Sequence, residues 1–369
     1  MRARAIGITV LFLAGTCAGC VRNAFLPSTA LVPPPSDRTL SALGDREDVI
    51  AKRMEQDVRA LATPSGRRSG TPGHEQARIY ILSRLKELGL SPYAGNSYAL
   101  PYAPGGLDFV NIAAVLPGRN IALPSLLLMA HYDTFGSKPG ADDNAAAIAV
   151  LLAAAEALRS APPERSVTFL FPDAEEPPYF MTDAMGSTWF YLHQRQGDFH
   201  CAVALDLVGH DVPIAGLEDL VFLTGIESDP GLENAFQAVS TGSGLRMVPT
   251  LNRYIGDLSD HHIHRVNRRP YLFFSAGVWK HYHRRSDVPD RLNYAKMARF
   301  ADYLTRLTHV LDGQPLTGPF EGYDTTPLEL RCLRQTVGPI VNQKGIALEN
   351  RRDIDRVARM LFLRLVTAR

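Results

Sequence analysis

The sequence has almost no net charge, few cysteines and, beyond residue 20, no long apolar run. Its 39 Lys and Arg nearly cancel its 38 Asp and Glu, so no global field attracts nucleic acid, and we expect no nucleic-acid partner. No later segment approaches the roughly 20 apolar residues that cross a bilayer. With 369 residues, 46% of them hydrophobic, the chain can bury the core of a large α/β domain. Function must therefore come from a local site.

The first 20 residues resemble an export signal. Arg2 and Arg4 precede an apolar run over about residues 6–14, and small residues follow up to Cys20. Ala18-Gly19-Cys20 resembles the end of a bacterial lipoprotein box, although Cys17 replaces the usual Leu. Ordinary cleavage and an uncleaved anchor are the alternatives. We expect an exported protein of the periplasm or the outer membrane, attached to the membrane through lipidated Cys20.

The cysteine content excludes a disulfide framework. The chain has four cysteines, and if Cys20 is lipidated, the mature chain keeps only Cys201 and Cys332 besides it. Two cysteines do not make a disulfide-rich scaffold, and their spacing does not reveal whether they pair.

The remaining chain is predicted to contain a linker, a catalytic domain and a C-terminal extension. Residues 21–45 contain four prolines without an apolar period, as expected of a tether. Residues 46–312 form the predicted catalytic domain. Residues 313–369 end in an amphipathic helix with Ile354, Val357, Leu361 and Leu365 on one face. We expect this helix to dock on the domain, with a partner or a membrane surface as the alternative.

Apolar runs alternate with helical patterns in the predicted catalytic domain. Strands are expected over residues 109–116, 125–130, 166–171, 202–207, 220–224 and 271–274. Helices are expected over residues 46–61, 75–88, 144–158 and 294–311. Thr71-Pro72-Gly73 lies where the second helix would start, and Ile79, Leu82, Leu85 and Leu88 follow at helical spacing. Several strands are apolar throughout, which favours a doubly wound, mixed and mostly parallel α/β sheet with helices on both faces.

Charged residues follow the predicted strands directly. In such sheets ligands bind beyond the carboxyl ends of the strands. The segments of this kind are His131-Tyr132-Asp133, Gly140 to Asn144, Asp173 to Glu176, Asp206, and Trp279 to His283. Each alone has an ordinary structural explanation, such as a helix N-cap for Asp143. Asp206, however, ends a buried strand, where an unpaired carboxylate would cost several kcal/mol unless a cation or a proton meets it.

These segments and others resemble the co-catalytic zinc aminopeptidases, a superfamily that also contains the glutaminyl cyclases. The resemblance covers about residues 54–311. Its motifs are Pro64 to Arg67, Gly70 to Gly73, Asn111 to Gly118, His131 to Asp133, Gly140 to Asn144, Glu175-Glu176, Gly186-Ser187, Leu205 to Gly209, Ser259 to His261, Tyr282-His283, Asp287 and Pro289 to Tyr294.

The resemblance implies two zinc ions in a site of imidazole and carboxylate ligands. His131 and Asp206 would hold one ion, Glu176 and His283 the other, and Asp143 would bridge both. Nitrogen and oxygen ligands of this kind suit zinc. Two dications and three carboxylates leave the site a net positive charge, which favours deprotonation of a bound water.

Two further roles follow from the resemblance. Glu175 would be the general base that takes a proton from the water and returns it to the leaving amine. Asp133 would orient the imidazole of His131 without binding the metal itself, although it could also be a simple turn residue.

Several residues depart from the pattern or have no assigned role. Arg284-Arg285 replaces the Thr-Pro that commonly follows the last ligand, which puts the local loop in doubt. His281 is a rival ligand to His283. Asp260, His261 and His262 are expected near the site, and His210 is expected to be structural.

The sequence predicts an aminopeptidase that releases N-terminal residues from a peptide substrate. The alternative is a glutaminyl cyclase with one zinc held by Asp143, Glu176 and His283, and with Glu175 and Asp206 moving protons. The long stretch 177–185 has the cyclase spacing. A third alternative, an inactive binding or scaffold protein, conflicts with the complete ligand set. Side-chain specificity and oligomeric state cannot be read from the sequence.

Overall fold

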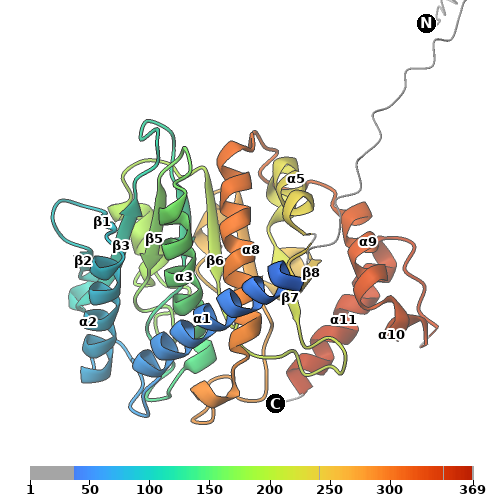
Figure 1. The fold of residues 1–369 in the computed structure, drawn as a ribbon, viewed down its shortest axis with the longest axis horizontal. Helices are drawn as coiled ribbons and strands as arrows, with labels where there is room; N and C mark the ends of the chain where they lie inside the picture. Colours follow the sequence, from blue (N-terminus) through green and yellow to red (C-terminus); the bar gives the residue numbers. More distant parts are fainter. Residues whose placement is uncertain (1–36, 241, 344, 368–369) are drawn as a thin grey trace, which may run out of the picture. The chain divides into compact units, whose positions relative to one another are not determined.

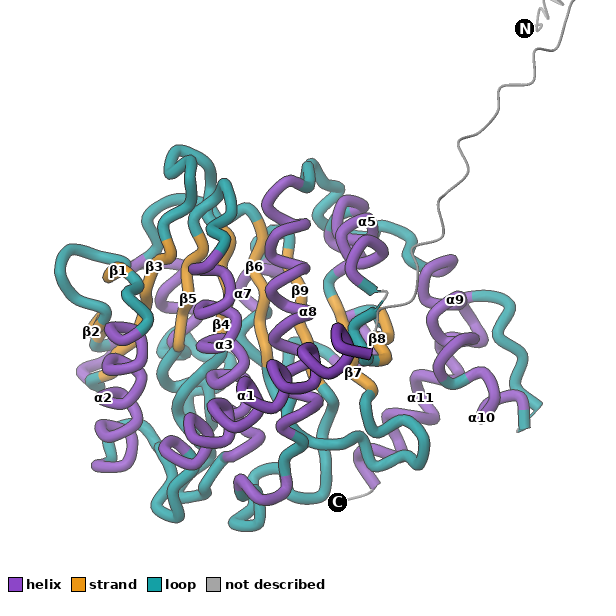
Figure 2. The backbone as a smooth tube through the Cα atoms, viewed as in Figure 1, coloured by secondary structure: helices purple, strands orange, loops and turns teal. Residues whose placement is uncertain are grey.

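A central β-sheet organises the chain (Figure 2). The structure, a computed structural model, describes residues 37–240, 242–343 and 345–367. The expected signal peptide with Cys20, and residues 21–36 of the expected linker, lie outside the described residues. Residues from Ala42 onward form one compact unit, and the description below concerns that unit.

Nine strands of the described residues make one sheet with a parallel centre. They are β1 (Ser91–Pro92), β2 (Ala99–Tyr102), β3 (Phe109–Leu116), β4 (Leu126–Met129), β5 (Val167–Phe171), β6 (Cys201–Leu205), β7 (Leu220–Thr224), β8 (Arg246–Pro249) and β9 (Tyr271–Ser275). Their order is β1-β3-β5-β4-β6-β9-β7-β8, with β2 also paired to β3. Strands β5, β4, β6 and β9 run parallel, whereas β3 and β7 join them antiparallel. The predicted doubly wound, mixed sheet is confirmed.

Both faces of the sheet are covered, which explains the uniformly apolar strands. Alternate residues of β4 enter different cores: Leu126 and Leu128 face one, Leu127 and Met129 the other. The first core contains residues of α1 (Asp37–Leu61), α2 (Pro72–Glu87), α3 (Ala146–Ser160), α5 (Pro230–Val239) and α8 (Tyr294–Gly313). Figure 1 shows α3 and α8 in front of the sheet. The second core includes Phe190, at the junction of α4 (Gly186–Trp189) and the π-helical turn η3 (Phe190–Gln194).

The predicted helices exist, with differences at their ends and in one packing face. Helix α1 begins at Asp37, so the last part of the expected linker is helical. Thr71 caps α2 by accepting a hydrogen bond from the backbone N–H of His74. The expected apolar stripe of α2 is wrong at Ile79, which is 57% exposed, because the buried face runs through Ala77, Ile81 and Leu85, four residues apart.

The sequence prediction missed the short strands and one special turn. Strands β1, β2 and β8 have two to four residues each, too few to show a pattern. Helix α3 begins at Ala146 because Ala141–Ala145 form a π-helical turn, η2. The remaining short elements are η1 (Pro104–Gly106), η4 (Ile226–Ser228), α6 (Asn252–Ile255), α7 (His262–Val266) and η5 (Pro289–Arg291). Cys201 and Cys332 are both buried and free, so they do not pair.

Three C-terminal helices pack beside the β7–β8 edge of the sheet (Figure 1). They are α9 (Thr326–Thr336), α10 (Gly338–Asn342) and α11 (Arg351–Thr367). Ile354 and Val357 of α11 are buried in a cluster with Val248 of β8 and Leu333 of α9, which confirms that the last helix docks on the domain. The side chains of Leu361 and Leu365 lie outside the described residues. Within the described ranges, no helix combines the length and apolarity needed to cross a membrane.

Candidate metal centre

The candidate site lies where the parallel strands end. The chain passes from β4 to β5 on one side and then to β6 on the other side of β4, so the strand order reverses at β4. Ligands bind at such a switch point in open α/β sheets. His131 follows β4, Glu175 and Glu176 follow β5, and Asp206 follows β6. The fold therefore brings residues from distant parts of the sequence to one edge.

The five predicted metal ligands converge in two groups that share Asp143. One group is His131, Asp143 and Asp206; the other is Asp143, Glu176 and His283. Asp143 Oδ1 lies 3.5 Å from Nε2 of His131, and Asp143 Oδ2 lies 3.1 Å from Nε2 of His283. The two oxygens of one carboxylate thus face two different imidazoles, as expected of a bridging ligand.

The polar atoms of these groups lack hydrogen-bond partners. Nε2 of His131, Nε2 of His283 and Oδ1 of Asp206 are buried without any. Although Oε2 of Glu176 lies 3.0 Å from Nε2 of His283, the angles do not make a hydrogen bond there. Buried polar atoms are rarely left in this state, and nitrogen and oxygen donors aimed at a common point suit zinc. The residues present therefore fit the two-ion site that the sequence predicted.

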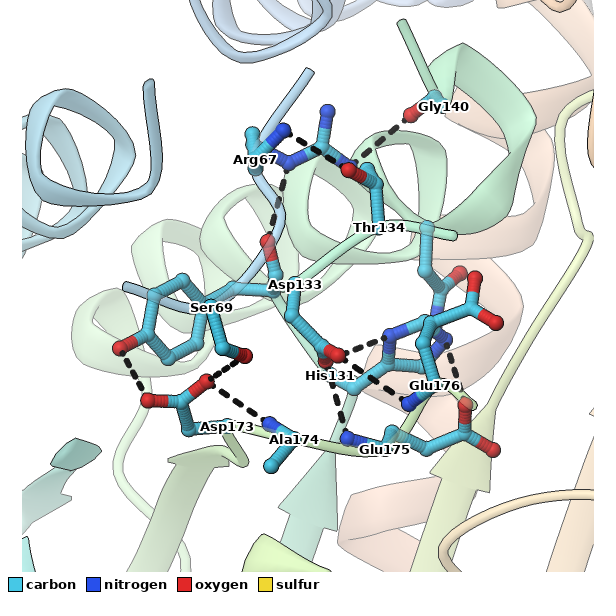
Figure 3. Close-up of polar contacts among 12 residues, drawn as sticks. Arg67, Ser69, His131, Asp133, Thr134, Gly140, Asp173, Ala174, Glu175 and Glu176 are labelled. Atoms are coloured by element: carbon cyan, nitrogen blue, oxygen red, sulfur yellow. Dashed lines mark hydrogen bonds and ion pairs between the residues drawn. The ribbon is translucent and has the colours of Figure 1, made fainter. Parts of the chain in front are cut away.

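Asp133 connects the strand ends behind the site (Figure 3). Its Oδ1 lies 3.4 Å from Nδ1 of His131, the ring nitrogen that points away from Asp143. Its two oxygens also accept hydrogen bonds from the backbone N–H groups of Glu175 and Glu176, both at 3.1 Å. Asp133 thus fixes three site residues at once, which is more than the imidazole contact expected from sequence.

A second carboxylate, Asp287, holds the backbone of the bridging ligand. It accepts hydrogen bonds from the N–H groups of Asp142 at 2.9 Å and Asp143 at 3.2 Å. Burial, joined by the charge of Asp142, raises the pKa of Asp287 to about 8. Asp142 in turn contacts Nδ1 of His210 at 2.6 Å, which supports the structural role expected for His210. Asp287 belongs to the motifs that resemble the family, but its sequence context alone indicates no role.

His283 is held by aromatic rings on both sides. It stacks on Phe135 with ring centroids 4.2 Å apart and on Tyr282 at 3.7 Å. Its φ of 56° is in the left-handed region, a strained conformation typical of functional sites. The rival His281 instead contacts the hydroxyl of Ser286 at 2.8 Å, outside both groups. Arg284 and Arg285 are exposed.

Arg67 braces the loop that carries the ligands (Figure 3). Its fully buried guanidinium donates hydrogen bonds to the carbonyls of Tyr132, Pro139 and Gly140 at 2.7 to 3.0 Å. Burial lowers the pKa of Arg67 to about 10. The motif from Pro64 to Arg67 therefore supports the segment between His131 and Asp143.

The site concentrates negative charge in a buried space. Burial, together with the charge of Asp143, raises the pKa of Glu176 to about 8, and burial also raises the pKa of Asp206. Burial alone would lower the pKa of His283, but contacts with Asp143 and Glu176 outweigh it and raise the pKa to about 9. Such a cluster is stabilised by a bound cation.

Three residues expected near the site lie in different places. Asp260 is fully buried, and burial, joined by the charges of Asp206 and Asp133, raises its pKa to about 6. His261 contacts the side-chain oxygen of Asn252 at 3.0 Å, and His262 contacts Asp257. Only Asp260 of the three belongs to the electrostatic surroundings of the ligands.

Comparison with known proteins places this geometry in a family. The model of peptidase family M28 matches residues 111–308, which include all five converging ligands. Outside the match are α1, α2 and the C-terminal helices α9 to α11.

Two curated relatives align with about half of the chain. YfbL of Escherichia coli, an uncharacterized protein, is 28% identical over 216 residues, 50% of this chain and 67% of YfbL. Aminopeptidase YwaD of Bacillus subtilis is 36% identical over 178 residues, 47% of this chain but only 36% of YwaD. Most of the length of YwaD is therefore unmatched.

Solved structures share the fold at low identity. The LapA aminopeptidase of Legionella pneumophila superposes with a TM-score of 0.61 at 17% identity, covering 75% of this chain and 76% of LapA. The glutaminyl cyclase of Tannerella forsythia gives a TM-score of 0.57 at 17% identity, covering 70% of this chain and 98% of the cyclase. Aminopeptidases and cyclases thus share this architecture.

Proposed function

Because the chain belongs to peptidase family M28, we propose that it is a zinc-dependent aminopeptidase that hydrolyses the N-terminal residue from peptides. The observation that carries the proposal is the shared carboxylate of Asp143, with one oxygen toward His131 and the other toward His283. A carboxylate shared in this way could bridge two metal ions, and two-metal hydrolysis uses a pair of ions about 3.5 to 4 Å apart. The named aminopeptidase among the relatives supports the same reaction class.

We assign the ligands as two overlapping sets. His131 and Asp206 would hold one ion, Glu176 and His283 would hold the other, and Asp143 would contact both. When bound, zinc supplies a Lewis acid that polarises the scissile carbonyl and lowers the pKa of a water. The three carboxylates offset three of the four positive charges.

Glu175 is the proposed general base. Its Oε2 lies 3.8 Å from Nε2 of His131, beside the ligands but outside both groups. Burial, joined by the nearby carboxylates of Glu176 and Asp206, raises the pKa of Glu175 well above its ordinary range. Cations among these carboxylates would lower the pKa of Glu175 again, toward neutral pH. A general base works best when its pKa lies near the operating pH. Glu175 then takes the proton of the attacking water and passes it to the leaving nitrogen.

Asp133 and Asp287 position this machinery without touching the substrate. Asp133 fixes the ring of His131 and the backbone of Glu175, and Asp287 fixes the backbone of Asp143. Partners of this kind orient ligands and typically change metal affinity or activity 10- to 100-fold when removed.

A glutaminyl-peptide cyclase is the second candidate, favoured by one observation. Asp143 and Glu176 approach His283 to within 3.1 Å, whereas His131 lies 3.5 and 3.8 Å from Asp143 and Asp206. One ion in the tighter group, with Glu175 and Asp206 moving protons, would suffice for cyclisation of an N-terminal glutamine.

A glutamine-led peptide separates the two reactions. The aminopeptidase releases free glutamine and a shortened peptide, whereas the cyclase releases ammonia and leaves the peptide bond intact. We expect free glutamine from the zinc-loaded protein and none from the same peptide after N-acetylation, since the reaction needs a free N-terminus. Ammonia release without free amino acid would replace the peptidase by the cyclase.

A further inference from the structure

A cavity connects the metal centre to the C-terminal helices. It has a volume of about 250 Å³. Asp143, Glu175 and Asp206 line one part of it, and the same cavity is lined by Leu333 of α9 and by Ile354, Val357 and Ala358 of α11. The C-terminal helices lie outside residues 111–308, the part that the family shares. This part of the wall therefore lies outside the residues that the family model matches.

The lining away from the ligands is mostly apolar, with the hydroxyl-bearing residues Thr224, Thr250, Tyr254 and Ser275 among it. Phe222, Val248 and Phe273 of the sheet line it together with the C-terminal residues. Among the described lining residues, Glu329 is the only charged group beyond the metal centre, and its Oε1 contacts Arg351 at 2.7 Å. A charged substrate side chain would lose its water here without gaining a free counter-charge.

The C-terminal wall is anchored rather than loose. Asp355 of α11 accepts hydrogen bonds from Arg253 at 2.6 Å and from the hydroxyl of Tyr254. Arg351 also ties the start of α11 to Glu329 of α9. Ile354 and Val357 pack into the buried cluster next to β8. Fixed apolar walls of this kind discriminate side chains by size, because a misfit cannot be relieved by movement.

We propose that α9 and α11 complete the binding pocket for the side chain of the substrate's N-terminal residue and select large apolar residues such as leucine and phenylalanine. The inference rests on the proposed aminopeptidase function. An aminopeptidase substrate has one residue before the scissile bond, so the side chain of this residue needs space beside the ligands, and the cavity lined by Asp143, Glu175 and Asp206 offers it. Apolar pockets of this type separate side chains by about 10- to 200-fold per missing methylene or methyl group.

The test compares leucine, phenylalanine, alanine and lysine p-nitroanilides on the zinc-loaded protein. We expect kcat/KM for leucine and phenylalanine to exceed that for alanine at least about tenfold, with lysine poorest. Ala358→Trp places a bulky ring in the cavity, and we expect it to lower the leucine-to-alanine ratio at least about tenfold. The matched control is Arg356→Trp, which adds the same ring to an exposed position of α11 and should keep the wild-type ratio.

Thermal unfolding and zinc content accompany each variant, and Ala358→Met replaces Ala358→Trp if the latter does not fold. A wild type that prefers alanine or lysine overturns the inference, as does a folded Ala358 variant with an unchanged ratio. If no p-nitroanilide is cleaved, the proposed function fails instead. Calorimetry then compares the affinity of the protein for free phenylalanine with its affinity for free alanine, which tests the pocket without catalysis. Equal affinities for the two amino acids would overturn the proposed apolar pocket.

Discussion

Asp143 is the residue on which the proposed centre depends most. Its two oxygens face imidazoles from distant parts of the sequence, His131 and His283, and Asp287 fixes its backbone. Removing this carboxylate would leave the buried His131 and the half-buried His283 without their shared anion.

Replacing Glu175 by glutamine separates catalysis from metal binding. Glu175→Gln keeps the shape of the side chain but cannot accept the proton, so we expect zinc content and folding to be retained while kcat falls about 10²- to 10⁴-fold. Steady-state kinetics and elemental analysis measure the two effects. Glu164→Gln, the same change at an exposed site, should keep full activity. Wild-type turnover in Glu175→Gln would show that another group is the base.

Zinc affinity should rise with pH. Contacts with Asp143 and Glu176 outweigh burial and raise the pKa of His283 from 6.5 to about 9, and zinc binds only the neutral imidazole. Below about pH 9 zinc must displace this proton, so its affinity should rise at least about tenfold per pH unit up to that pH. Without zinc, the stabilising charge of His283 is fully present below pH 6.5 and lost as pH rises through about 9. Competition with a chelator measures the slope, and a flat profile would contradict the assignment.

Most ligands were predictable because each follows a predicted strand. His131, Glu176 and Asp206 come directly after the apolar runs that became β4, β5 and β6. The choice of His283 over His281 came from the resemblance alone. The role of Asp287 could not be predicted, because it acts on backbone N–H groups 144 residues away in sequence.

Among the elements, the turn η2 was not predicted because its conformation depends on tertiary contacts. The sequence from Asn144 onward has a helical composition, yet Asp143 and Asn144 leave helical backbone geometry. Asp287 holds the N–H groups there, and Asn144 donates to the carbonyl of Leu205. Local propensity cannot reveal partners on distant strands.

The ligand loop between β4 and α3 should depend on Arg67. Arg67→Met keeps most of the apolar stem but leaves the buried carbonyls of Tyr132, Pro139 and Gly140 without their donor. We expect a loss of about 3 to 5 kcal/mol in the free energy of unfolding and weaker zinc binding. Denaturant titration measures the change in the free energy of unfolding.

The control is Arg68→Met, the same change at the exposed neighbouring residue, with an expected effect within about 0.5 kcal/mol. Equal stability of the two variants would show that Arg67 does not brace the loop.

For the molecule as a whole, the sequence predicted the sheet and its layers better than the contacts of the C-terminal extension. The amphipathic pattern of α11 indicated docking, but not that Val357 and Ala358 would line the cavity of the metal centre. Such a contact joins two segments far apart in sequence, and no local pattern reports it.

We also propose that the protein is exported and attached to a membrane through Cys20, on the sequence of residues 1–20 alone. Cys20→Ala should abolish labelling with a radioactive fatty acid and move the protein from the membrane to the soluble fraction. Cys17→Ala should leave both unchanged. Labelling that persists in Cys20→Ala, or is absent from the wild type, would contradict lipid attachment at this residue.

The most direct test of the metal centre is anomalous diffraction from zinc-loaded crystals at the zinc absorption edge. The account predicts two peaks about 3.5 to 4 Å apart, on either side of the Asp143 carboxylate, with His131 and Asp206 at one and Glu176 and His283 at the other. A single peak, or none within reach of these five side chains, would contradict it.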